Sequence, residues 1–133
     1  YKRQILGKTT NWQKITEKIL SLHKKMRFVA IIDLKGNIVE GIMKEGKASL
    51  ESQKQQQDFC QQVAVKKEMR QELDRNIGKV SYVHIERKNV TQIVVYIQLK
   101  TIFVTVEPEL SMAKKLEIVK KIKRVVINLK KIS

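Results

Sequence analysis

The sequence predicts an α/β protein of the α+β type, in which a five-stranded antiparallel sheet has helices on both faces. Segments with helical and strand-like periodicity follow one another in the order α-β-β-α-β-β-β-α. The segments between neighbouring strands leave room only for short turns, and short turns require antiparallel pairing. At 133 residues, the chain is expected to form one domain over residues 11–133, preceded by a basic arm of residues 1–10.

The first half of the sequence predicts a helix, a hairpin and a second helix. Asn11 can cap the first helix, whose apolar residues recur at steps of three and four: Trp12, Ile15, Ile19, Leu22 and Met26. Residues 27–34 are apolar at consecutive positions, which indicates a strand covered on both faces. A turn at residues 33–37, with Gly36, leads to a return strand at 38–43. The second helix, roughly 50–75, starts at Ser49 or Ser52, and Ser52 with Gln55 has capping-box spacing.

The second half predicts three strands and a final helix. Gly78 is suited to the position just past the end of the middle helix. The strands are expected at about residues 79–86, 90–99 and 101–107, with the second of them central because it is apolar on both faces. Pro108 ends the sheet, and Ser111 or a neighbour begins the last helix. Its predicted buried stripe is Leu116, Val119, Ile122, Val126 and Leu129.

The charge is concentrated at the two ends of the chain. Of 28 Lys and Arg and 13 Asp and Glu, residues 1–27 hold eight basic and one acidic side chain, and residues 110–133 hold eight and one. The 82 residues between them are close to neutral. Most of the net charge of +15 therefore belongs to two basic segments. A lone cysteine, no apolar run long enough to cross a bilayer and no signal-peptide core favour a cytoplasmic protein.

No catalytic, metal or cofactor signature is present in the sequence, so we expect a protein that is not an enzyme. Gly7-Lys8-Thr9 resembles the end of a phosphate-binding loop but lacks the earlier glycine and the preceding strand. Two histidines, His23 and His84, are too few for a metal site without converging partners. Cys60, next to Phe59, is expected to be a small buried hydrophobe.

The chain resembles the Roadblock / dynein light chain superfamily, including small archaeal Roadblock-like proteins. The residues that carry the resemblance are the amphipathic opening helix, the hairpin F-V-A-I-I-D-L-K-G-N-I-V (28–39) and the stretch I-G-K-V-S-Y-V-H-I-E-R (77–87), which two more strands follow. The resemblance implies dimers formed by the middle helices and neighbouring edge strands, with the first and last helices together on the opposite face. It also implies a non-enzymatic scaffold or regulator, often of small Ras-like GTPases.

The middle helix is predicted to carry the pairing of two chains. It is rich in glutamine and has a thin apolar face, so a second chain could complete it. With the strand that follows, this predicts a homodimer interface made of Gln55, Gln56, Phe59, Gln62, Val63, Tyr82 and His84.

The basic helices leave three alternatives open. They can be a solvated face, a surface that binds nucleic acid without sequence preference, or a surface for anionic membranes. A membrane partner ranks third, because the final helix has no Trp or Phe and its apolar face is committed to the sheet. The residues expected to contact nucleic acid are Lys14, Lys18, Lys120, Lys121 and Arg124. The leading expectation is a dimeric adaptor, with a nucleic-acid-binding protein as the alternative.

Overall fold

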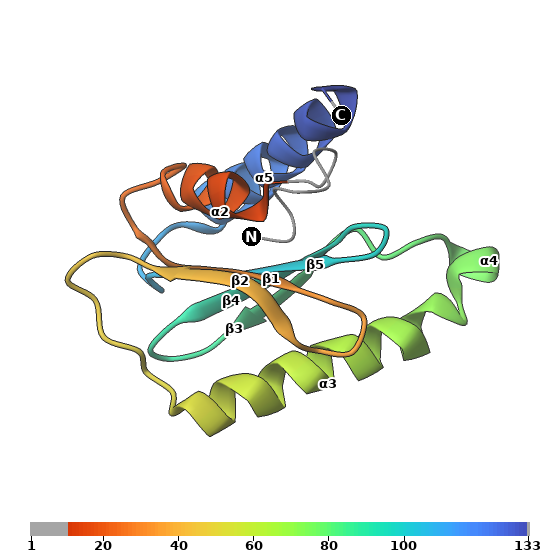
Figure 1. Cartoon of the computed structure of the whole chain (residues 1–133), viewed down its shortest axis with the longest axis horizontal. Coiled ribbons are helices and arrows are strands. Elements are labelled where there is room, and N and C mark those ends of the chain that lie inside the picture. The colour runs from red at the N-terminus through yellow and green to blue at the C-terminus, as the bar shows by residue number, and fades with distance from the viewer. Residues whose placement is uncertain (1–10, 133) are drawn as a thin grey trace.

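The computed structural model describes residues 11–132, and the side chains of residues 11–128. The predicted basic arm, residues 1–10, lies outside the described residues. The elements follow the predicted order, with one short helix added: α2 (Trp12–Leu20), β1 (Met26–Ile32), β2 (Ile38–Met43), α3 (Gln53–Gln71), α4 (Asp74–Ile77), β3 (Val83–Glu86), β4 (Thr91–Tyr96), β5 (Thr101–Val106) and α5 (Met112–Ile132). Figure 1 shows α2 and α5 on one face of the sheet and α3 on the other.

The five strands form one sheet in the order β2-β1-β5-β4-β3, and every neighbouring pair is antiparallel. This confirms the predicted fold class. The middle strand is β5, and β4 lies beside it in the interior, so the position predicted for the segment 90–99 is one strand away from the centre. The two edges of the sheet are β2 and β3.

Two hydrophobic cores fill the spaces between the layers. The larger core joins α2 and α5 to the sheet through residues such as Ile19, Val29 and Ile122, none of which is exposed to solvent. The smaller core lies under α3, where Cys60 and Val63 meet Phe103. Strands β1 and β5 are buried almost throughout because each contributes alternate residues to both cores.

Side-chain caps define where the helices begin, as the sequence predicts. The Asn11 side chain accepts a hydrogen bond of 3.2 Å from the backbone N–H of Lys14. Ser52 caps α3, and its capping box with Gln55 is complete in both directions. In the turn between β1 and β2, Gly36 has a φ of +89°, as expected.

Several predicted boundaries are wrong. Helix α2 ends at Leu20, and Leu22 and Met26 reach the same core from the following turn and from β1. The segment predicted as a strand at 79–86 pairs only from Val83 onward. In α5, Leu116 was predicted to be buried but is 41% exposed, whereas Ile118 and Val125, which were not predicted, are buried. The side chain of Leu129 lies outside the described part of α5.

Candidate interaction surfaces

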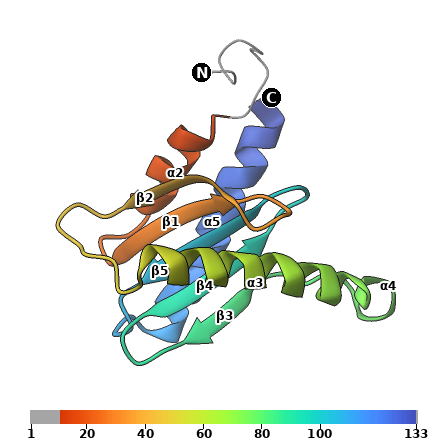
Figure 2. The same ribbon diagram turned by 60° about the horizontal axis from the view of Figure 1, so that its bottom comes forward.

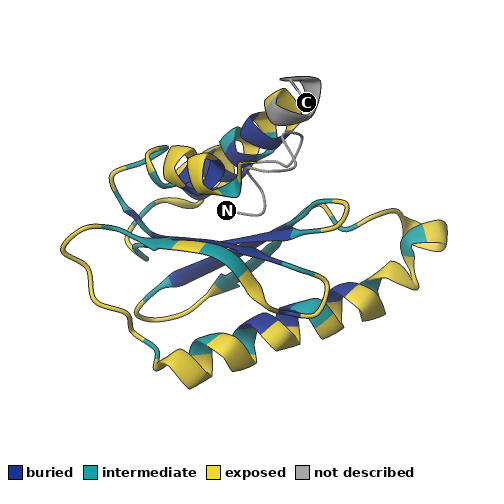
Figure 3. Ribbon diagram, in the orientation of Figure 1, coloured by how far each residue is buried: buried dark blue, intermediate teal, exposed yellow. Residues whose placement is uncertain are grey.

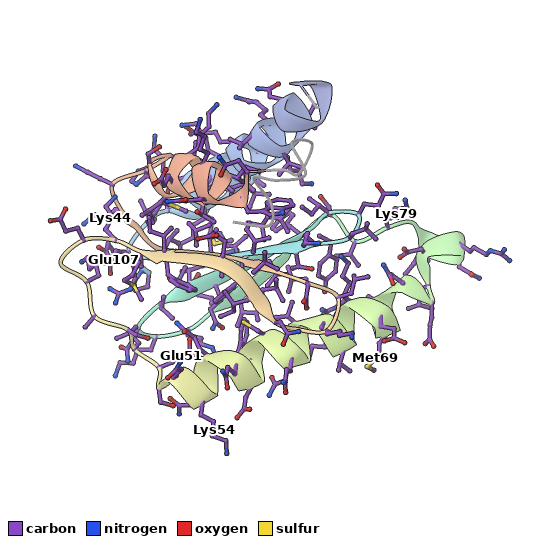
Figure 4. The ribbon with its side chains drawn as sticks, in the orientation of Figure 1. Lys44, Glu51, Lys54, Met69, Lys79 and Glu107 are labelled. Atoms are coloured by element: carbon purple, nitrogen blue, oxygen red, sulfur yellow. The ribbon has the colours of Figure 1, made fainter. Side chains whose placement is uncertain are left out.

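Four exposed apolar side chains follow one another along the end of α3, the turn after it and α4. Val65, Met69, Leu73 and Ile77 follow at steps of four residues, and their exposed fractions are 58%, 61%, 55% and 77%. In Figure 4, Met69 points away from the sheet. Figure 3 shows that α3 is buried along the side that faces the sheet and exposed along the other. We call these four residues the outer apolar row.

The residues predicted for dimer pairing on α3 divide between its two faces. Gln55 and Gln62 are exposed, and Gln56 is half-buried. In contrast, Val63 is 5% exposed in the smaller core, and the Phe59 ring packs on Phe103 of the chain itself at 4.7 Å between centroids. Phe59 and Val63 thus already contact residues of their own chain, and their role in pairing two chains stays a prediction.

Strand β3 forms an open edge of the sheet, but its predicted pairing residues lie on the face opposite to α3. Tyr82 packs against the larger core, and the Nζ atom of Lys123 from α5 lies 5.9 Å from the centroid of its ring. The His84 Nε2 atom lies 2.9 Å from an Oε1 atom of Glu86. Sequence reasoning thus grouped side chains that the sheet separates, and a pairing role for β3 would use its backbone edge.

Glu86 connects β3 to β4 and to α5. Its carboxylate accepts hydrogen bonds from Lys115 Nζ at 2.8 Å and from Thr91 Oγ1 at 2.9 Å, besides its contact with His84. The hydrogen bond from Lys115, followed by that from His84, lowers the pKa of Glu86 to about 2. Lys115 is only 3% exposed, so this contact also neutralises a buried ammonium group.

Helices α2 and α5 bring the two basic segments together on one face of the sheet (Figures 1 and 2). Lys14, Lys18, Lys120 and Arg124 are all exposed there. Lys121 is half-buried and forms an ion pair with Glu117 at 3.2 Å. The five residues predicted for a basic surface therefore belong to one helical layer, although Glu117 neutralises part of it.

Two hollows lie beside α3, one near its beginning and the other near its end. The first, of about 650 Å³, is between the beginning of α3, the loop before it and the turn that joins β3 to β4. Gln55, Gln56, Phe59 and Gln62 line it, so the glutamines that suggested an interface partly face a cavity of their own chain. The second, of about 620 Å³, lies at the other end of the sheet.

The described residues offer few groups for catalysis or metal binding. Burial raises the pKa of the Cys60 thiol to about 11, with a smaller contribution from Glu51, which leaves the thiol protonated and unreactive at neutral pH. Within residues 11–128, no cluster of three or more His, Cys, Asp or Glu side chains could hold a metal ion. None of the helices in the described part has the length and apolar composition needed to cross a membrane.

Residues 10–129 match a protein family described as a family of unknown function, DUF6659. The chain belongs to the DUF6659 family. No curated protein matches its sequence. Solved structures nevertheless share the fold of this DUF6659 chain at low sequence identity.

MglB from Myxococcus xanthus matches with a TM-score of 0.70 and 12% identity, covering 93% of this chain and 100% of MglB. A Roadblock/LC7 domain from Streptomyces avermitilis matches with a TM-score of 0.58 and 10% identity, over 89% of this chain and 98% of that domain. Profilin IA from Acanthamoeba castellanii matches with a TM-score of 0.58 and 17% identity, over 89% and 98% of the two chains. This DUF6659 protein therefore has a Roadblock-like fold, which a profilin also shares.

Proposed function

We propose that this protein is a non-enzymatic adaptor or regulatory scaffold of the Roadblock type that acts as a homodimer. The observation that carries the proposal is the outer apolar row of Val65, Met69, Leu73 and Ile77, each more than half exposed. Exposed apolar side chains that follow one another along α3, the next turn and α4 favour burial against another apolar surface. The Roadblock-like fold supports the same arrangement, because the resemblance implies pairing through the middle helices.

The charge distribution also supports pairing through α3 in preference to α2 and α5. The middle of the chain, residues 28–109, is nearly neutral, with twelve basic and eleven acidic side chains. Two copies can therefore approach through α3 without strong repulsion, whereas two basic layers of α2 and α5 would repel one another. The exposed glutamines Gln55 and Gln62 can donate and accept hydrogen bonds beside the apolar row.

Light scattering during size-exclusion chromatography at micromolar concentration tests the homodimer. We expect the wild-type mass to correspond to a dimer and Met69→Asp to run as a monomer, because a carboxylate would be desolvated within the apolar contact. Met112→Asp is the matched control: Met112 lies on α5 and is 63% exposed, against 61% for Met69. A monomeric wild-type protein, or equal effects of the two variants, would rule out pairing through this row.

We further propose a small Ras-like GTPase as the partner of the dimer, because the Roadblock resemblance implies this class. The experiment is a pull-down from the native host, in which wild-type protein is compared with Met69→Asp. Enrichment of a small GTPase by the wild-type protein is the expected outcome. Recovery of nucleic acid or of unrelated proteins alone would contradict this part of the proposal while leaving the dimer intact.

The alternative function is sequence-independent binding of nucleic acid, and the convergence of α2 and α5 in one layer favours it. Lys14, Lys18, Lys120, Lys121 and Arg124 would contact phosphates, so that affinity falls steeply with salt. Titration of labelled DNA and RNA at low and high salt tests the alternative, with Lys120→Glu expected to reduce the salt dependence. Absence of binding at low salt eliminates this function.

A further inference from the structure

The second hollow forms where the sheet is incomplete. Strand β3 starts at Val83, which pairs with Val94, so β4 has no β3 neighbour from Val95 onward. The chain between Gly78 and Val83 runs outside the sheet instead and leaves a hollow of about 620 Å³ between α3, α4 and α5. A volume of this size is typical of sites for small molecules.

The hollow is lined by four basic side chains from three parts of the chain: Lys67 and Arg70 of α3, Lys79, and Lys123 of α5. Among the described residues that line it, Asp74 is the single carboxylate. Among the side chains of residues 11–128, none of the four cations forms an ion pair with Asp or Glu. The hollow therefore carries a formal excess of positive charge, whereas the lysines near Glu107 and Glu117 are paired.

Lys67 places one of these positive charges inside the folded protein. It is 4% exposed, and its Nζ atom donates to the carbonyl oxygens of Ile97 at 2.8 Å and Lys100 at 3.0 Å, and to Thr101 Oγ1 at 3.4 Å. These oxygens satisfy its hydrogen bonds but bring no negative charge. Burial, with a smaller contribution from Lys100, lowers the pKa of the ammonium group. A bound anion would compensate for this charge.

The other cations are held or directed by neutral partners. The Arg70 Nη1 atom donates to the hydroxyl of Tyr96 at 2.6 Å, which fixes one side of the guanidinium group and leaves its other N–H groups available. Lys123 contacts Ser81 Oγ, and Lys79 is exposed at the rim. Arg and Lys in this arrangement suit phosphate oxygens, since a guanidinium group can bind two of them at once.

We propose that this hollow binds a small phosphate-bearing molecule. The phosphate oxygens are contacted by Arg70, Lys79 and Lys123. The buried ammonium group of Lys67 adds its positive charge to the site. Val95, Ile97 and Val126 form an apolar part of the lining, so an organic phosphate with an apolar portion fits better than inorganic phosphate. The site is separate from the proposed homodimer interface, because no residue of the outer apolar row lines the hollow and Met69 points away from the sheet (Figure 4).

Isothermal titration of the full chain with inorganic tripolyphosphate tests the contacts to phosphate oxygens, on which the proposal depends. We expect saturable binding by the wild-type protein and a loss of affinity of about tenfold or more in Lys79→Glu and in Arg70→Gln. The matched control is Lys54→Glu, which makes the same charge change at the opposite end of α3 (Figure 4) and lies outside the hollow. Its affinity should remain within about twofold of the wild-type value, because distant surface charges are screened.

Two outcomes would overturn the proposal. The first is no binding by wild-type protein, and the second is an equal loss of affinity in Lys54→Glu and Lys79→Glu, which would indicate a general effect of charge. Vesicles containing phosphatidic acid distinguish a lipid headgroup from a soluble phosphate compound: under the first outcome, binding to the vesicles would show that the basic residues recognise a lipid surface instead. Changes in the ¹⁵N NMR signals of Ser81 and Gln98, which line the hollow, should accompany binding.

Discussion

Gly36 determines how closely α3 can approach the hairpin of β1 and β2. A Cβ atom at this position would lie 2.7 Å from the Cα atom of Gln61 and 3.0 Å from the carbonyl oxygen of Cys60. Both are backbone atoms of α3, so the clash could be relieved only by moving the helix or the turn. The residue also has a φ of +89°, which L residues with a side chain rarely adopt.

Gly36→Ala should lower the free energy of unfolding by about 2–4 kcal/mol, from backbone strain and from the displaced helix together. Gly46→Ala separates the two causes, because Gly46 has a φ of +80° but no atom within 4 Å of the added Cβ. It should cost about 1–2 kcal/mol, from strain alone. Urea unfolding of both variants measures the difference, and equal costs would show that the contact with α3 contributes nothing.

Glu86 should make the stability depend on pH in the acid range. Its pKa is about 2 in the folded protein, against an ordinary value of 4.5, so its contribution to stability is complete above about pH 4.5. The contribution is lost as the pH falls from there towards 2. Urea midpoints from neutral to acid pH should decline less in Glu86→Gln than in wild type, whereas Glu68→Gln, on the exposed side of α3, should follow the wild type. Parallel curves for wild type and Glu86→Gln would contradict this role.

At the scale of secondary-structure elements, α3 depends strongly on its cap because it buries few residues. Only Cys60, Val63 and Lys67 of its nineteen residues are buried. Ser52→Ala removes the capping box and should destabilise the protein by about 1 kcal/mol. Ser49→Ala, in the same loop, should change stability by less than about 0.5 kcal/mol, since among the described residues its hydroxyl forms hydrogen bonds only with the backbone of Glu51. Thermal unfolding of the two variants checks this, and an equal loss would refute the cap's contribution.

Helices, strands and turns could be predicted from the sequence where a local feature, such as a helix cap or a turn glycine, marks them. The caps at Asn11 and Ser52, the turn at Gly36 and the apolar strand β1 each have a local physical cause, and all four were confirmed. The predicted end of the first helix was wrong because the larger core takes residues from both α2 and the strand that follows it. Met26 continues the helical spacing of α2 although it belongs to β1, because both elements face the same core. The spacing of apolar residues alone could not show whether Met26 belongs to the helix or to the strand.

The candidate sites were less predictable because they depend on which face of the sheet each segment covers. Tyr82 and His84 follow the glutamine-rich helix in the sequence, yet they lie across the sheet from it. The four residues of the outer apolar row recur at steps of four in the sequence, but such a spacing is equally typical of residues that a helix buries in the core. The phosphate-binding hollow brings together Lys67, Lys79 and Lys123, and only the tertiary structure shows that these residues are neighbours.

At the scale of the whole molecule, the net charge of +15 should oppose folding at low ionic strength. Added NaCl screens this repulsion, so the melting temperature should rise with salt by several degrees, which for a domain of this size corresponds to about 1 kcal/mol. Lys120→Glu, within the basic layer, should be less sensitive to salt than the wild type. Thermal scans across a salt series measure this, and a melting temperature that is constant or falls with salt would contradict the expectation.

The burial of Lys67 also provides a reporter of local opening. An amine reagent cannot reach its Nζ atom while α3 covers the turn between β4 and β5, whereas Lys66, its neighbour on the helix, is exposed. The labelling rate of Lys67 relative to Lys66 therefore measures how often α3 detaches from the sheet without global unfolding. A partner that clamps α3 should slow the labelling of Lys67. The same shielding means that an acetylating enzyme could modify Lys67 only in the detached state.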